Sequence, residues 1–226
     1  MSQVAIGDNL LIRPWIKTFV RLNNSFIVKR GVSVRQMLEV SGTLSAYINH
    51  TIKDTKESIW IAQREGRAKD SNDRTQPSVL KMLCMSGGKD IIGNLKSLNI
   101  VPVAISYEFD PCDYLKAQEF QLKRDNPEYH KTQRDDLLNM EILNNKGRVH
   151  FTISQLINDQ LDQLDPNMDR NELFAAVASI IDKEIYRHYR FYPNNYVAYD
   201  LLSGTRRFSD HYGLKDKKAF EEHLQK

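Results

Sequence analysis

Short apolar runs that end in charged turns constrain the fold of this chain most strongly. Residues 26–28 (Phe-Ile-Val) and residues 59–62 (Ile-Trp-Ile-Ala) each have the length of a β-strand, and the second run is continuously apolar, as in a strand buried on both faces. Residues 32–54 lie between them and have the length of a helical crossover between parallel strands. Strands that alternate with helices predict an α/β fold with a central, mostly parallel sheet flanked by helices.

Helical patterns accompany these strands. Small and apolar residues recur after residue 33 at the spacing of one helix face: Val34, Met37, Leu38, Ser41, Leu44, Ser45, Ile48 and Ile52. Further helices are predicted over residues 77–85, 90–98, 114–123, 135–144 and 171–189, and further strands over residues 4–7, 99–107 and 149–153. We therefore expect an α/β core over residues 1–153 and a helical C-terminal extension over residues 154–226 that packs on it.

Composition narrows the classes of partner. The chain has 226 residues, with 32 Lys+Arg against 29 Asp+Glu, and its formal charge of +3 does not by itself predict nucleic-acid binding. The two cysteines, Cys84 and Cys112, lack metal-ligand spacing and fit a reducing compartment. We expect neither a metal nor a cofactor. No apolar stretch approaches the ~20 residues that span a bilayer, and the first residues do not form a signal peptide. These features predict a cytoplasmic protein.

Cationic turns follow two of the predicted strands. Arg64, Glu65, Gly66, Arg67 and Lys69 come after the run at residues 59–62, and Arg30 comes after the run at residues 26–28. In open α/β sheets, ligands bind beyond the carboxyl ends of the strands, and arginine can hold a phosphate with two hydrogen bonds. The alternative is an ordinary surface turn with solvated charges, and the residue types alone favour that alternative.

Three other patterns in the sequence do not form functional motifs. Ser86-Gly87-Gly88-Lys89 is not a phosphate-binding loop of the Walker type, because that loop needs a glycine where Leu83 stands. None of the six histidines has the spacing of a zinc site or lies beside a cysteine nucleophile. His130 and His211 each precede an aspartate by five residues, which chance explains in a chain with many aspartates.

Three segments, taken in order, resemble the glycerophospholipid acyltransferase superfamily, which includes the lysophosphatidic-acid acyltransferases. They are "NNSFIVKRG" (residues 23–31), "IWIAQREGRAK" (residues 59–69) and "IVPVAISYEFDP" (residues 100–111). They are similar to the family's strand ending in Arg, its F-P-E-G-T-R-S block and its V-P-V strand. The resemblance covers roughly the first half of the chain.

The resemblance implies a reaction and a set of site residues. A fatty acyl group passes from acyl-CoA or acyl-carrier protein to a hydroxyl of a glycerophosphate-type lipid acceptor, as in phospholipid biosynthesis. Arg30 and the Glu65-Gly66 pair match the family's acceptor-phosphate blocks. Arg67 stands at the family's Thr position, so Arg67 or Lys69 would supply the remaining charge.

One block of the family has no counterpart. The H-x-x-x-x-D block, in which a His takes the hydroxyl proton, should precede residue 23, and none of the first 22 residues is a His. We therefore expect no catalytic residue within the sequence as given and an N-terminal part that is missing from it. The alternative is a non-catalytic phosphate- or lipid-binding module of the same fold.

Two further segments could form interaction surfaces. Residues 10–19 combine apolar and aromatic residues with cations, which fits either a helix at a membrane surface or a packed amphipathic helix. Peripheral contact with the inner face of the membrane thus stays an open alternative. Residues 184–204 are rich in tyrosine, which can stack on single-stranded nucleic acid, but a packed aromatic stripe is the favoured interpretation.

Overall fold

The computed structural model describes residues 2–8, 11, 14–29, 33–64, 72–110, 112–129 and 146–225. The chain divides into two compact units. The first unit contains Met1–Pro102 and Ser154–Arg187, and the second contains Val103–Ile153 and His188–Lys226.

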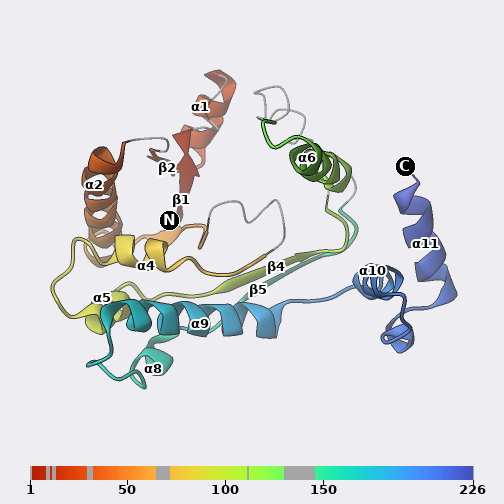
Figure 1. The fold of residues 1–226 in the computed structure, drawn as a ribbon. Coiled ribbons are helices and arrows are strands. Elements are labelled where there is room, and N and C mark those ends of the chain that lie inside the picture. The colour runs from red at the N-terminus through yellow and green to blue at the C-terminus, as the bar shows by residue number, and fades with distance from the viewer. Residues whose placement is uncertain are drawn as a thin grey trace. The chain divides into compact units, whose positions relative to one another are not determined.

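A three-stranded parallel sheet forms the framework of the first unit (Figure 1). Its strands are β1 (Ser2–Gly7), β2 (Ser25–Val28) and β3 (Ser58–Trp60), in the order β2-β1-β3. In the register, Gly7 lies opposite Val28, and Val4 lies opposite both Ser25 and Trp60. The predicted α/β class with a parallel sheet is therefore confirmed, and the strand predicted at residues 4–7 is the central one.

Helices connect the parallel strands. Helix α1 (Pro14–Leu22) links β1 to β2, and α2 (Val34–Lys53) links β2 to β3. Helix α2 begins with a capping box, in which the Gln36 backbone N–H donates to Ser33 Oγ (3.4 Å) and the Ser33 N–H donates to Gln36 Oε1 (3.2 Å). This box satisfies two N–H groups at a helix start that otherwise lack partners. It therefore fixes where α2 begins after the end of β2.

The prediction that residues 59–62 form a strand buried on both faces is wrong. Strand β3 ends at Trp60, whose side chain is 38% exposed, and Ile59 is only half-buried. The reason is that β3 lies at an edge of the sheet, where it has one neighbouring strand instead of two. A continuous apolar run does not distinguish an edge strand from a central one.

Helices from both parts of the chain supply the core of the first unit. They are α4 (Pro77–Leu83), α5 (Ile91–Ser97), α8 (Asn158–Leu161) and α9 (Arg170–His188). The most deeply buried side chains come largely from these helices: Ile48, Leu80, Leu95, Ile157, Leu161, Phe174 and Val177. The helix predicted over residues 171–189 is confirmed as α9. On α2 the predicted apolar face is buried at Ser45 and Ile48, whereas Met37 and Leu38 are exposed.

The second unit contains an antiparallel strand pair and helices. Strand β4 (Val103–Tyr107) pairs with β5 (Val149–Ile153), so that Ile105 lies opposite Phe151. The predicted strand over residues 99–107 therefore exists, but it belongs to this pair and not to the parallel sheet. The helices of this unit are α6 (Asp113–Asp125), α10 (Pro193–Ser203), the short 3-10 helix η2 (Ser209–His211) and α11 (Leu214–Leu224).

Aromatic rings gather between α10 and η2. Tyr196 stacks on His211 with ring centroids 4.4 Å apart and lies 5.4 Å from the ring of Phe208. The tyrosine-rich segment thus contributes in part to packing within the second unit, as its aromatic spacing predicts. Among the described residues, no helix is both long enough and apolar enough to cross a bilayer.

Candidate functional site

The carboxyl ends of the parallel strands meet at one edge of the sheet. Lys29 directly follows β2 and is exposed, and the chain after β3 runs through Gln63 to the half-buried Arg64. Because β2 and β3 both run parallel to β1, both cations follow strand ends on the carboxyl side of the sheet, with β3 ending opposite Val4 and β2 ending opposite Gly7. This is the edge at which open α/β sheets bind their ligands.

The predicted phosphate-binding residues Arg30, Glu65, Gly66, Arg67 and Lys69 lie outside the described residues. The structure describes the residues that flank them. On the side of β2 these are Lys29 and Ser33, and on the side of β3 they are Arg64 and Asn72. The sequence prediction for the five residues themselves therefore stays a prediction.

Hydrogen bonds tie together the two ends of the segment that contains Glu65. The Gln63 carbonyl accepts from the Gln76 N–H (3.0 Å), and Gln63 Nε2 donates to the Asp73 carbonyl (3.4 Å). The Thr75 N–H donates to Asp182 Oδ1 on α9 (2.7 Å), and Thr75 is buried. Residue 63 is thus held next to residues 73 and 76 after the end of β3. The core of the first unit anchors both ends of the predicted phosphate segment.

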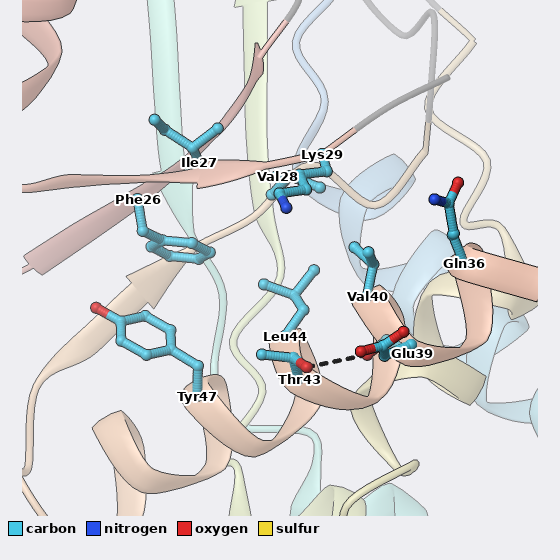
Figure 2. A pocket seen from close by; sticks show the side chains of 10 residues that line it. All are labelled: Phe26, Ile27, Val28, Lys29, Gln36, Glu39, Val40, Thr43, Leu44 and Tyr47. Carbon is cyan, nitrogen blue, oxygen red and sulfur yellow. Dashed lines mark hydrogen bonds between the residues drawn. The ribbon is translucent and has the colours of Figure 1, made fainter. Parts of the chain in front are cut away.

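An apolar pocket of about 470 Å³ lies between β2 and α2 (Figure 2). Phe26 points from β2 toward Tyr47 on α2, and Val40 and Leu44 project from α2 toward the strand. The pocket lining also includes Lys29, the first residue beyond β2. The apolar space therefore extends to Lys29, at the carboxyl end of β2.

Polar contacts close the other end of this pocket. The rings of Phe26 and Tyr47 lie 5.1 Å apart between centroids. The Tyr47 hydroxyl donates to Gln3 Oε1 on β1 (2.5 Å), and Gln3 Nε2 donates to Glu57 Oε2 (2.6 Å). These bonds connect α2, β1 and the start of β3, so that the aromatic end of the pocket has a fixed wall.

The sequence prediction missed this pocket. Its signal was present: Val40, Leu44 and Tyr47 stand at i, i+4 and i+7 on α2, and Phe26 and Val28 share one face of β2. Periodicity showed that both elements have an apolar face. It did not show that the two faces leave a space between them.

A second pocket, of about 880 Å³, lies beside the segment that links α4 to α5. Its lining includes Gly87, Gly88, Lys89 and Arg170. Asp90 caps α5 here, because its Oδ1 accepts from the Gly93 N–H (2.9 Å), and this confirms a helix break and restart instead of a phosphate loop. Burial raises the pKa of the nearby Cys84 thiol to about 11. Cys84 is therefore protonated near neutral pH and is a poor nucleophile.

His211, which precedes Asp216 by five residues, does not pair with it, as the chance interpretation of this spacing predicts. His211 stacks on Tyr196, while Asp216 accepts from the Gly213 N–H (2.8 Å) at the start of α11. His130 and its aspartate lie outside the described residues. The structure instead pairs His223 Nε2 with Asp113 Oδ2 (2.5 Å), which are 110 positions apart, so that no short motif could have found them.

In the first unit, the described residues contain one histidine, His50. It lies in the last turn of α2, where Nδ1 contacts Asp54 Oδ2 at 2.7 Å, and both side chains are mostly exposed. A crossover helix runs antiparallel to its strands, so the end of α2 lies at the amino edge of the sheet, away from Lys29 and Arg64. His50 is therefore not placed to act at the carboxyl edge.

Among the described residues, no group of three or more His, Cys, Asp or Glu side chains could hold a metal ion. The described part of the candidate site thus consists of an apolar pocket with Lys29 in its lining, and of Arg64, which follows the carboxyl end of β3. Comparison of the chain with protein-family profiles, with curated proteins and with solved structures finds no match.

Proposed function

We propose that this chain carries the acceptor site of an acyltransferase that acts on a glycerophosphate-type lipid. One observation carries the proposal: an apolar pocket between β2 and α2 runs to Lys29, a cation at the carboxyl end of β2. A lysophospholipid needs both features, because its acyl chain is apolar and its phosphate is anionic. Arg30 and Arg67 would bind the phosphate, and the pocket would hold the chain.

The proposed reaction is an acyl transfer. The acceptor hydroxyl oxygen attacks the thioester carbonyl of acyl-CoA or acyl-carrier protein, an ester C–O bond forms, and the C–S bond breaks. The hydroxyl proton passes to a base, and the sulfur leaves as a thiol after it gains a proton. In the family that the sequence resembles, the base is a histidine that an aspartate orients. Cations at the phosphate contribute by fixing the acceptor hydroxyl near the thioester.

The alternative is a module that binds the lipid without turning it over. The observation in its favour is that His50, the one described histidine of the first unit, lies at the opposite edge of the sheet. An assay that follows both lipid binding and thiol release, made with a protein that contains this chain together with an H-x-x-x-x-D block, separates the two. Thiol release that needs both thioester and lysophosphatidate, and that Glu65→Ala abolishes, supports the transferase. Saturable lipid binding without thiol release supports the module.

The pocket is tested by filling it. Leu44→Trp puts a larger side chain into the space between α2 and β2, so affinity for a long-chain lysophosphatidate should fall by about tenfold or more, while affinity for glycerol phosphate should not change. Calorimetry measures both. Leu38→Trp is the matched control, because Leu38 lies on the same helix, is 67% exposed and does not line the pocket. Equal effects of both variants, or none from Leu44→Trp, would remove the pocket from the acceptor site.

A further inference from the structure

Helix α1 exposes an apolar face. Trp15 and Phe19 are each 59% exposed and Leu22 is 80% exposed, and the three stand at i, i+4 and i+7 on one side of the helix. Ile16 and Val20 are buried, and α1 contacts β2 (Figure 1). The helix is therefore docked through one side and presents a second, aromatic side to the surroundings. Exposed side chains of this size on adjacent turns mark an interaction surface.

The surrounding segment is strongly basic. Residues 9–38 contain six cations and no Asp or Glu, so this stretch carries +6 while the rest of the chain carries −3. The cations are Arg13, Lys17, Arg21, Lys29, Arg30 and Arg35. Of these, Lys17, Arg21, Lys29 and Arg35 lie in the described part, where all four are exposed and none is ion-paired with another described residue. The net positive charge of the chain is thus concentrated in the stretch of sequence that contains α1 and β2.

We propose that α1 is a docking helix for an anionic phospholipid surface. Trp15, Phe19 and Leu22 would enter the boundary between headgroups and acyl chains, and Lys17 and Arg21 would contact the lipid phosphates. Aromatic and aliphatic side chains beside cations are the composition of helices that lie in this boundary. Each cation near an anionic membrane adds to the attraction, so an acid-free stretch fits this partner.

Other partners fit the surface less well. A nucleic acid matches the cations but offers nothing apolar to Leu22, the most exposed of the three side chains. A second copy of the chain would bring the same cations together, which costs energy because like charges repel. The membrane proposal stands on α1 and its charges alone, and it holds whether or not the chain transfers acyl groups.

The test uses the full chain and vesicles of phosphatidylcholine with or without phosphatidylglycerol. Because Trp15 and Trp60 are the two tryptophans, a Trp60→Phe background makes the emission report on Trp15. We expect sedimentation with the anionic vesicles, a blue shift of Trp15 emission, and quenching by brominated lipid. Raising the salt to about 0.5 M should weaken the binding, since exposed charges are then screened.

Charge reversal identifies the surface. Lys17→Glu/Arg21→Glu should weaken binding to anionic vesicles by at least about tenfold. The matched control is Lys183→Glu/Lys215→Glu, two exposed lysines on α9 and α11, which gives the same net charge and should bind nearly as wild type. Trp15→Ser/Phe19→Ser should also weaken binding, and circular dichroism should show an unchanged fold because both side chains are exposed.

Three outcomes would overturn the proposal. The first is equal loss of binding in the α1 variant and in its control, which would make the effect one of net charge. The second is salt-sensitive binding to an oligonucleotide with no binding to vesicles, which would assign the surface to nucleic acid. The third is a dimer that Trp15→Ser/Phe19→Ser dissociates, again without vesicle binding.

Discussion

At the scale of single residues, Asp200 shows how a buried charge is held in the second unit. Its side chain is buried and accepts hydrogen bonds from Thr205 Oγ1 (2.9 Å), the Phe208 N–H (3.0 Å) and the Tyr212 hydroxyl (3.0 Å). Burial alone would raise the pKa of this carboxyl, but the hydrogen bonds outweigh it and the pKa is lowered. The ionised carboxylate therefore joins the end of α10 to the segment before α11.

Asp200→Asn should lower the thermal midpoint of unfolding by roughly 5 °C or more near neutral pH, because the amide keeps the shape and loses the charge-assisted bonds. The folded pKa lies below the unfolded value, so this stabilisation is present above about pH 4 and is lost as the pH falls through the folded pKa. Calorimetry at several pH values should show the gap between wild type and variant closing with acid. Asp210→Asn, at an exposed aspartate nearby, is the control.

At the scale of elements, the contact between α2 and α4 holds one wall of the pocket between α2 and β2 in place. Ser45 is fully buried on α2, and its hydroxyl donates to the Leu83 carbonyl (3.0 Å) and accepts from the Ser86 N–H (3.0 Å). Asn49 Nδ2 donates to the same carbonyl (3.1 Å). One face of α2 is thus fixed to the end of α4, while the next face along carries Val40, Leu44 and Tyr47 toward β2.

Ser45→Ala should destabilise the protein by about 0.5–1.5 kcal/mol, because it removes a fully buried hydroxyl that donates to the Leu83 carbonyl and accepts from the Ser86 N–H. Denaturant unfolding measures the loss. Thr43→Ala removes a hydroxyl from the same helix, but that hydroxyl is exposed and bonds only to the Glu39 carbonyl within α2 (3.0 Å), so its cost should stay within about 0.5 kcal/mol. Equal costs would show that Ser45 does not join the two helices.

At the scale of the whole molecule, the helices and strands were easier to predict from the sequence than which of them lie beside one another. Helices α2 and α9 and strand β2 could be read from local periodicity, because each apolar stripe reflects a face that the element buries. The exposure of Trp60 and the pairing of β4 with β5 could not, since both depend on which strands lie beside them. The same applies to His223 and Asp113, which only the folded chain brings together.

For the candidate site too, one part could be predicted from the sequence and another could not. The cationic turns after β2 and β3 were visible in the sequence, because a strand followed by Lys, Arg and Gly is a local pattern. The apolar pocket was not, because it arises where two apolar faces from different elements leave space between them. The structure adds this pocket to the predicted cations, and the two together motivate a lipid phosphate as the ligand.

The most direct test of that account compares two lipids by calorimetry, a lysophosphatidate and a monoacylglycerol with the same acyl chain. The account predicts that the phosphate tightens binding by at least about tenfold, and that Arg30→Ala/Arg67→Ala removes this difference while Lys183→Ala/Lys215→Ala keeps it. Equal affinity for the two lipids in wild type, or an unchanged preference in Arg30→Ala/Arg67→Ala, would contradict it.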